Sequence, residues 1–319
     1  MSKLKVRKFG QSDMPTEFGL GGAVLNNSSY EDGVATVKRA LELGVTYFDT
    51  SPGYCRNLSQ PIMGEGLAGA GDGIMIATKV GYFATADGFR SPAAIKDQIK
   101  DNLRLLGRSS VDVLQVHETN WVGWWEDGVE DPHADVDITV ERDWNHAPVL
   151  EALREAKQEG LCRYVGITGN RAPIMSHILD NVEVDTFLLA YSYDPIIRNA
   201  EDSALEIVAR KGTTLILGAI FYGGRLVAVH PEWIADPPEW MDSELKGRFE
   251  KLYAIQQDCG ISLVQLSVRF AMAREEPAVV LVGAAKPSEL EESIQAVHDG
   301  PLPPDLQAAI ESLGVRGRL

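Results

Sequence analysis

Short hydrophobic segments alternate with amphipathic segments along most of the chain. The hydrophobic segments are rich in β-branched and aromatic residues and are bounded by turn residues, a pattern typical of buried β-strands. Eight strands are expected, at residues 19–25, 45–49, 74–79, 111–117, 162–168, 185–191, 213–219 and 278–284. Apolar residues at helical spacing predict helices at residues 36–43, 59–69, 93–107, 149–160, 174–182, 203–212 and 263–274.

This alternation predicts an α/β fold, a (β/α)8 TIM barrel with an N-terminal β-hairpin near residues 4–18. Repeated β–α units with short connections give parallel strands, and eight of them close into a barrel. The whole chain, residues 1–319, is expected to form one such domain. The alternative is a doubly wound open sheet that binds a dinucleotide. It is disfavoured because no G-x-G-x-x-G motif follows a strand.

Two long connections interrupt the alternation, at residues 118–146 and 221–247. Both follow strand ends, so both are expected on the carboxyl-end face of the barrel, where active sites of this fold lie. The first connection is rich in tryptophan: Trp121, Trp124, Trp125 and Trp144. Two roles remain open for these side chains. They pack the connection against the barrel or another subunit, or they cover a substrate.

Three successive predicted strands end in an ionisable residue. VTYFD ends at Asp49, IMIATK at Lys79 and DVLQVH at His117, and Tyr54 follows the first strand by five positions. Each residue alone has an ordinary structural explanation, such as a turn or a solvated strand end. Because the carboxyl ends of parallel strands share one rim, their joint occurrence favours a catalytic group.

These four residue types suit proton transfer to and from a carbonyl oxygen. A tyrosine with an unperturbed pKa of about 10 exchanges protons poorly at neutral pH. A neighbouring lysine is expected to lower the pKa of Tyr54, and Asp49 to orient that lysine. His117 could donate to a carbonyl oxygen or relay the proton. Interconversion of a carbonyl and an alcohol also needs a hydride carrier, which implies a nicotinamide cofactor.

Composition excludes several classes of function. The net charge of −16 argues against nucleic acid, whose binding needs a basic face. Cys55, Cys162 and Cys259 lack metal-ligand spacing, so reduced thiols in a cytoplasmic protein and no metal site are expected. No apolar stretch approaches the length of a membrane span. A small molecule is the expected partner, and the oligomeric state stays open.

Three segments resemble the catalytic segments of the aldo-keto reductases: FDTSPGY at 48–54, ATKVG at 77–81 and VLQVH at 113–117. The resemblance implies that Tyr54 is the general acid/base, that Lys79 and Asp49 modulate it, and that His117 orients the carbonyl. It covers nearly the whole chain. The C-terminal VVLVGAAKPSELEESI at 279–294 is similar to that family's cofactor-clamp loop.

Within the family, the chain is most similar to the branch of L-galactose dehydrogenases and D-threo-aldose (L-fucose) 1-dehydrogenases. SQPIMGEGL at 59–67, RYVGITG at 163–169 and DPPEWMDSELK at 236–246 carry this similarity. It implies oxidation of the anomeric carbon of a free sugar to a lactone with a nicotinamide acceptor. Aromatic side chains pack well against sugar C–H faces. Substrate contacts are therefore expected from Trp121, Trp124, Trp125 and Tyr222.

The alternatives are a general aldehyde or ketone reductase that uses NADPH and, outside enzymes, a cofactor-sensing regulatory subunit. By resemblance, the cofactor is NAD or NADP, and it is expected to contact Gly21, Gly22, Thr168, Tyr191, Ala219, Phe221, Gly223, Gly283, Ala284, Ala285, Lys286 and Glu292. Ala285 stands where several NADP-preferring relatives have an arginine for the 2′-phosphate, which slightly favours NAD. After Tyr54, Cys55-Arg56-Asn57 departs from the glycine that usually follows the tyrosine.

Overall fold

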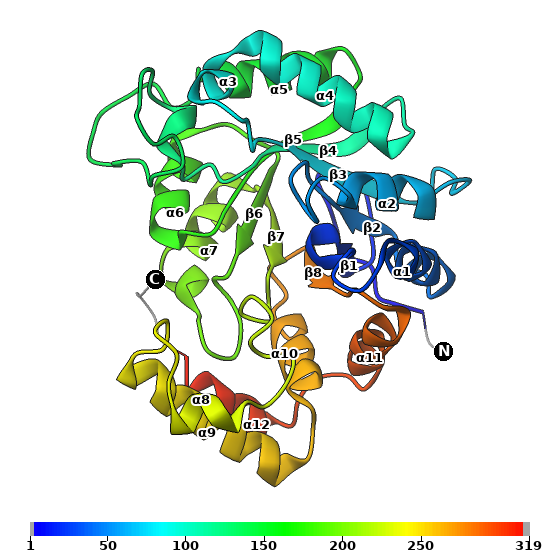
Figure 1. Ribbon diagram of the computed structural model, residues 1–319, viewed down its shortest axis with the longest axis vertical. Helices are drawn as coiled ribbons and strands as arrows, with labels where there is room; N and C mark the ends of the chain where they lie inside the picture. Colours follow the sequence, from blue (N-terminus) through cyan, green and yellow to red (C-terminus); the bar gives the residue numbers. More distant parts are fainter. Residues whose placement is uncertain (1–2, 315–319) are drawn as a thin grey trace.

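Eight parallel strands pair in sequence order and close into a barrel in the computed structural model, which describes residues 3–314 (Figure 1). The strands are β1 Phe18–Gly21, β2 Tyr47–Asp49, β3 Met75–Val80, β4 Val111–Val116, β5 Cys162–Gly169, β6 Thr186–Ala190, β7 Thr214–Gly218 and β8 Val279–Gly283. β1 pairs with both β2 and β8, which completes the ring. The predicted (β/α)8 barrel is therefore confirmed.

Helices surround the strands on the outside of the barrel (Figure 1). They are α1 Tyr30–Glu42, α2 Ser59–Gly66, α3 Ala86–Arg90, α4 Pro92–Leu106, α5 Pro148–Gln158, α6 Ala172–Asn181, α7 Asn199–Lys211, α8 Pro231–Ala235, α9 Ser243–Cys259, α10 Leu263–Met272, α11 Pro287–His298 and α12 Pro304–Glu311. Within residues 3–314, no helix combines the length and the apolar character needed to cross a membrane.

Local sequence explains why these helices begin and end where they do, as α4 illustrates. The Ser91 side chain accepts a hydrogen bond from the Ala94 N–H, and Pro92 occupies the first turn, where no N–H is needed. Gly107 ends the helix with φ of 62°, a left-handed conformation that glycine adopts at little cost. The buried face carries Ile95, Ile99, Leu103 and Leu106. This apolar stripe docks the helix on the barrel.

The structure corrects the prediction in two places. The expected first strand at 19–25 ends at Gly21, and residues Gly22–Val24 form a short 3-10 turn. A Cβ at Gly22 would lie 2.5 Å from the Ser59 Oγ, so the chain needs glycine to turn here. The second connection, 221–247, is only partly irregular because it contains α8 and the start of α9.

The N-terminal hairpin is present as two isolated antiparallel bridges, Val6 with Thr16 and Phe9 with Asp13. It closes the amino end of the barrel with the fully buried Phe9 ring. That ring packs against Tyr47 and Tyr164 at centroid distances of 5.5 and 5.3 Å. The base of the barrel is therefore filled by side chains.

Side chains from alternate positions of each strand point into the barrel, because successive residues of a strand face opposite sides. The filled interior includes Tyr47, Ala77, Val113, Leu188, Ile216 and Leu281. Inward positions at the carboxyl end bring one residue from each strand, or from just after β4, to the rim: Gly21, Asp49, Lys79, His117, Thr168, Ala190, Gly218 and Gly283.

Replacing Gly166 by alanine tests this tight interior. The new Cβ would lie 2.0 Å from the Thr186 Oγ1 and 2.8 Å from its carbonyl oxygen, so backbone must move. Overpacking of this kind lowers the free energy of unfolding by about 1–3 kcal/mol. Urea denaturation measures the change, with Gly71→Ala as a control because nothing lies within 4 Å of its added Cβ. Equal stability of the two variants contradicts the prediction.

Candidate active site

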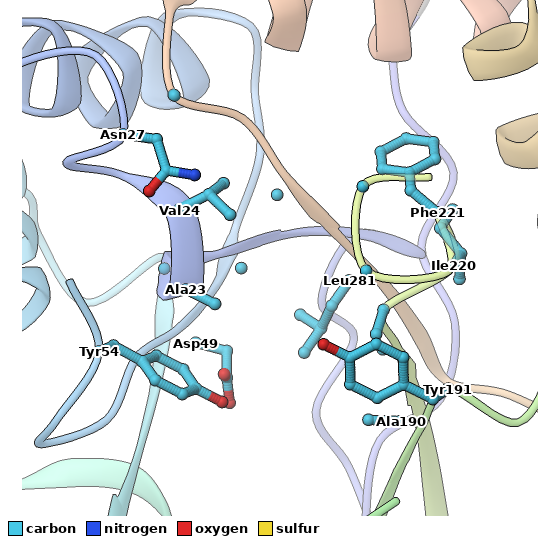
Figure 2. Close-up of a pocket in the computed structure, with 18 of the residues that line it drawn as sticks. Ala23, Val24, Asn27, Asp49, Tyr54, Ala190, Tyr191, Ile220, Phe221 and Leu281 are labelled. Carbon is cyan, nitrogen blue, oxygen red and sulfur yellow. The ribbon is translucent and has the colours of Figure 1, made fainter. Parts of the chain in front are cut away.

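The eight rim residues line one cavity of about 900 Å³ at the carboxyl end of the barrel. They divide it into two halves. The polar half consists of Asp49, Lys79, His117 and Thr168, from β2 to β5 and their ends. The other half is called the small half because its rim residues have no side chain larger than a methyl group. It consists of Ala190, Gly218, Gly283 and Gly21, from β6, β7, β8 and β1. Figure 2 shows Asp49 and Tyr54 on one side of the cavity and Tyr191 and Leu281 on the other.

A buried ion pair forms the base of the polar half. The Lys79 Nζ donates to the Asp49 Oδ1 at 2.5 Å and to the Thr50 carbonyl oxygen at 3.0 Å. The side chains of both ionised residues are almost completely buried. Burial raises the pKa of Asp49, and the neighbouring Lys79 charge opposes that rise. The second Asp49 oxygen, Oδ2, is buried without a hydrogen-bond partner in the part of the chain that the structure describes.

Tyr54 reaches this pair from the loop after β2. Its hydroxyl lies 3.2 Å from the His117 Nε2, and the Lys79 Nζ lies 4.9 Å from its ring centroid. Burial raises the pKa of Tyr54 well above its usual value, and the Asp49 charge adds to the rise. The expected lowering by Lys79 is therefore wrong for this structure. Burial and the Asp49 charge thus favour the neutral phenol form of Tyr54.

His117 is held by contacts on both ring nitrogens and on its backbone. Its Nδ1 lies 2.7 Å from the Ser51 Oγ, and its carbonyl oxygen accepts the Trp124 indole N–H at 2.9 Å. Burial and the Lys79 charge hold its pKa well below the usual value, so the imidazole is neutral. Ser51 was not predicted, although it lies inside the FDTSPGY segment. Ser51 lies three residues before Tyr54, and its local sequence does not distinguish it from an ordinary turn residue.

The residues after Tyr54, which differ from the family pattern, have an unusual backbone conformation. Cys55, Arg56 and Asn57 all adopt left-handed backbone conformations, with φ of 54°, 57° and 69°. Each such residue costs about 1–2 kcal/mol, less for asparagine. The Asn57 Oδ1 accepts the Gly53 N–H at 3.0 Å, and the Cys55 Sγ accepts the Asn26 N–H at 3.3 Å. These bonds fix the loop that carries Tyr54.

The structure brings most of the expected cofactor residues to the cavity. Those that line it are Gly21, Gly22, Thr168, Tyr191, Ala219, Phe221, Gly223, Gly283, Ala285, Lys286 and Glu292. Ala284 is a correction, because it is buried in the core and does not line the cavity. Lining residues that were not predicted include Ala23, Val24, Asn27, Ser28, Tyr82, Glu118, Glu289 and Ser293. Four of these eight, Ala23, Val24, Tyr82 and Glu118, lie within three residues of a strand end, a position that could have identified them.

The lining residues fit a nicotinamide dinucleotide. The Thr168 Oγ1 is buried at the rim without a hydrogen-bond partner among the described residues, as a group that binds an amide would be. The small half leaves room for a flat ring, since its side chains are at most a methyl group. The cavity also extends to Lys286 and Glu292 at the start of α11, far enough to hold an elongated ligand.

The tryptophans expected to contact substrate have structural roles instead. Trp124 and Trp125 are buried and do not line the cavity. Trp125 donates its indole N–H to the Thr119 carbonyl oxygen at 2.7 Å and packs against Trp144. Trp121 and Tyr222 are half-buried and also lie outside the cavity lining. The first connection is thus packed on the barrel, and its indole N–H groups hold the chain where it leaves β4.

Residues 17–314 match the sequence profile described as the aldo/keto reductase family. The chain belongs to this family. It is therefore an oxidoreductase, in agreement with the Asp49, Tyr54, Lys79 and His117 cluster. Members of the family use NAD(P)H, which agrees with the shape and polarity of the cavity.

Two curated aldo/keto reductase relatives act on sugars by name. An L-galactose dehydrogenase of Arabidopsis thaliana is 28% identical over 327 residues, covering 99% of this chain and 92% of that protein. A D-threo-aldose 1-dehydrogenase of a Pseudomonas species is 21% identical over 87% of this chain and 88% of that protein. Among solved structures, the holo form of an aldo-keto reductase from Bacillus halodurans has a TM-score of 0.75. It is 25% identical and covers 98% of this chain and 97% of that one.

Replacing Lys79 by methionine tests the buried ion pair of this reductase. The variant leaves Asp49 as an uncompensated buried carboxyl group, so the free energy of unfolding falls by about 3 kcal/mol or more. The double variant Asp49→Asn/Lys79→Met removes that charge and recovers much of the loss. Urea denaturation at pH 7 measures both. A Lys79→Met protein as stable as the parent contradicts the role given to the pair.

Proposed function

We propose that this aldo/keto reductase is an NAD-dependent aldose 1-dehydrogenase that acts on sugars resembling L-galactose or L-fucose. The observation that carries the proposal is the juxtaposition of the Tyr54–His117 pair with opposite rim positions, Ala190, Gly218, Gly283 and Gly21, that carry no side chain larger than a methyl group. Similarity to an L-galactose dehydrogenase along nearly the whole chain supports the choice of a sugar. The polar half also offers hydrogen-bonding groups to a polyhydroxylated substrate.

Thr168 and the small half of the rim would hold the nicotinamide, which supplies the hydride acceptor when bound. Tyr54 and His117 would bind the reacting oxygen of the substrate. Because Tyr54 is a neutral phenol, it donates its proton directly to a carbonyl oxygen in the reductive direction.

The oxidative direction requires a base, and the geometry supplies one in two steps. Tyr54 accepts the proton of the substrate hydroxyl as it releases its own proton to the His117 Nε2, 3.2 Å away. The neutral imidazole has a lone pair for that proton when its Nδ1–H faces Ser51. Asp49 partly balances the resulting positive charge beside Lys79.

Steady-state assays with L-galactose, L-fucose and D-arabinose plus NAD test this function. We expect oxidation of at least one aldose, and a loss of about 10²–10⁴-fold in kcat for Tyr54→Phe, because the proton donor is removed. NAD affinity, measured by fluorescence quenching, stays near the parent value. Tyr30→Phe is the control, since Tyr30 on α1 does not line the cavity and donates its hydroxyl to Glu65.

The second candidate function is a general aldehyde or ketone reductase. Turnover of 4-nitrobenzaldehyde with NADPH, combined with no reduction of NAD by any aldose, would select it. If Tyr54→Phe turned over every substrate as fast as the parent protein, Tyr54 would not be the proton donor in either candidate function.

The proposed preference for NAD rests on charges at the start of α11. The Glu289 side chain accepts a hydrogen bond from the Ala285 N–H at 2.8 Å. This backbone N–H is therefore already bonded to a carboxylate and is not available to bind a phosphate. Glu292 also lines the cavity, held by the Ser262 hydroxyl at 2.7 Å. Two carboxylates beside one cation, Lys286, disfavour the additional negative charge of a 2′-phosphate.

The cofactor preference is measured as the ratio of kcat/KM for NAD to that for NADP. We expect a ratio of at least about ten, equivalent to roughly 1.4 kcal/mol. Glu289→Gln lowers the ratio of kcat/KM for NAD to that for NADP, because the variant removes one negative charge from the cavity. Glu291→Gln on the same helix is the control, since Glu291 pairs with Arg39 and does not line the cavity. A ratio below one refutes the preference.

A further inference from the structure

Glu118, the residue after His117, has three unusual properties in one place. Its backbone is left-handed, with φ of 48°. Its side chain lines the cavity, and its Oε2 is buried without a hydrogen-bond partner. Burial raises the pKa of Glu118 to about 7, against the opposing charge of Lys79.

None of these properties stabilises the fold. A left-handed conformation is strained for a side chain of this kind, and a buried carboxyl oxygen without a partner has lost its hydration. Glu118 forms no ion pair in the described part of the chain. Its cationic neighbours are already engaged: Lys79 pairs with Asp49, and Arg171 with Asp135. The Glu118 carboxyl group therefore lies at the cavity wall with an oxygen that accepts no hydrogen bond from the described part of the protein.

We propose that Glu118 determines substrate specificity by accepting hydrogen bonds from the hydroxyl groups of a polyhydroxylated carbonyl or hemiacetal substrate. The inference rests on the proposed function and assigns a recognition residue to it. A carboxyl group suits this ligand class because a hydroxyl donor replaces the hydration that burial removed.

The surroundings of Glu118 fit the same ligand class. It follows His117 directly, so it lies beside the position where the reacting oxygen binds. Tyr82 lines the same wall, and its ring packs edge-on against His117 at a centroid distance of 4.8 Å. Tyr191 lines the cavity from the end of β6. An acceptor between aromatic surfaces selects a ligand with both hydroxyl groups and C–H faces.

The test compares two aldehydes of equal chain length, glyceraldehyde and propanal, reduced with NADH by the parent protein and by Glu118→Gln. Glutamine keeps the shape of the side chain and removes its charge. We expect the parent to prefer glyceraldehyde. In Glu118→Gln the ratio of kcat/KM values should fall at least about tenfold, the loss expected for one hydrogen bond to a charged group. Glu130→Gln, an exposed glutamate of the same connection, should keep the parent ratio.

The outcomes separate the two proposals. A parent that oxidises an aldose, with a glyceraldehyde preference unchanged in Glu118→Gln, overturns the role of Glu118 alone. Equal losses on both aldehydes assign Glu118 to structure and also overturn it. A parent that oxidises no aldose and shows no preference for glyceraldehyde overturns the proposed function together with this inference.

Discussion

Closure of eight parallel strands is the constraint on which the rest of the molecule depends. A closed ring fixes which residues of neighbouring strands lie side by side, and the two-residue period then fixes which of them face inward. The register pairs Asp49 with Ala77 and Lys79 with Gln115, so Lys79 and His117 each lie two positions beyond the partner of the preceding rim residue. The tilt of the strands in a closed barrel compensates for this stagger and brings Asp49, Lys79 and His117 to one rim. The same rim continues through glycine and alanine on the other strands. The candidate catalytic groups and the small residues opposite them therefore reach the rim for the same geometric reason.

Burial at that rim determines the electrostatics of the site. Lys79 is buried and forms an ion pair with Asp49. Desolvation then controls the remaining groups: it keeps the tyrosine protonated and the histidine uncharged. A site of neutral donors and acceptors moves a proton between oxygens without creating an isolated buried charge in its resting state.

The strand and helix pattern predicted the barrel, because hydrophobic periodicity is read over many residues. A few residues that depart from the pattern do not change the prediction. The location of Asp49, Lys79 and His117 at the rim was also predictable, since each ends a predicted strand, and Tyr54 follows the first of these ends by five positions. The roles of Trp124 and Trp125 were not, because a tryptophan that covers a ligand and one that anchors a loop have the same local sequence. The raised pKa of Tyr54 follows from its burial and from the nearby Asp49 charge, which only the three-dimensional structure reveals.

The left-handed residues concentrate at the carboxyl end of the barrel. Tyr82, Glu118, Tyr191 and Ala219 each follow a strand and line the cavity, and Cys55 begins the strained turn after Tyr54. The opposite end is closed by Phe9 and its hairpin. Conformational strain lowers the free energy of local opening, so amide hydrogens near the cavity exchange with solvent sooner than those around Phe9. We therefore expect amide protection to rise along the barrel axis from the cavity to Phe9, and a ligand bound in the cavity to slow exchange at that end.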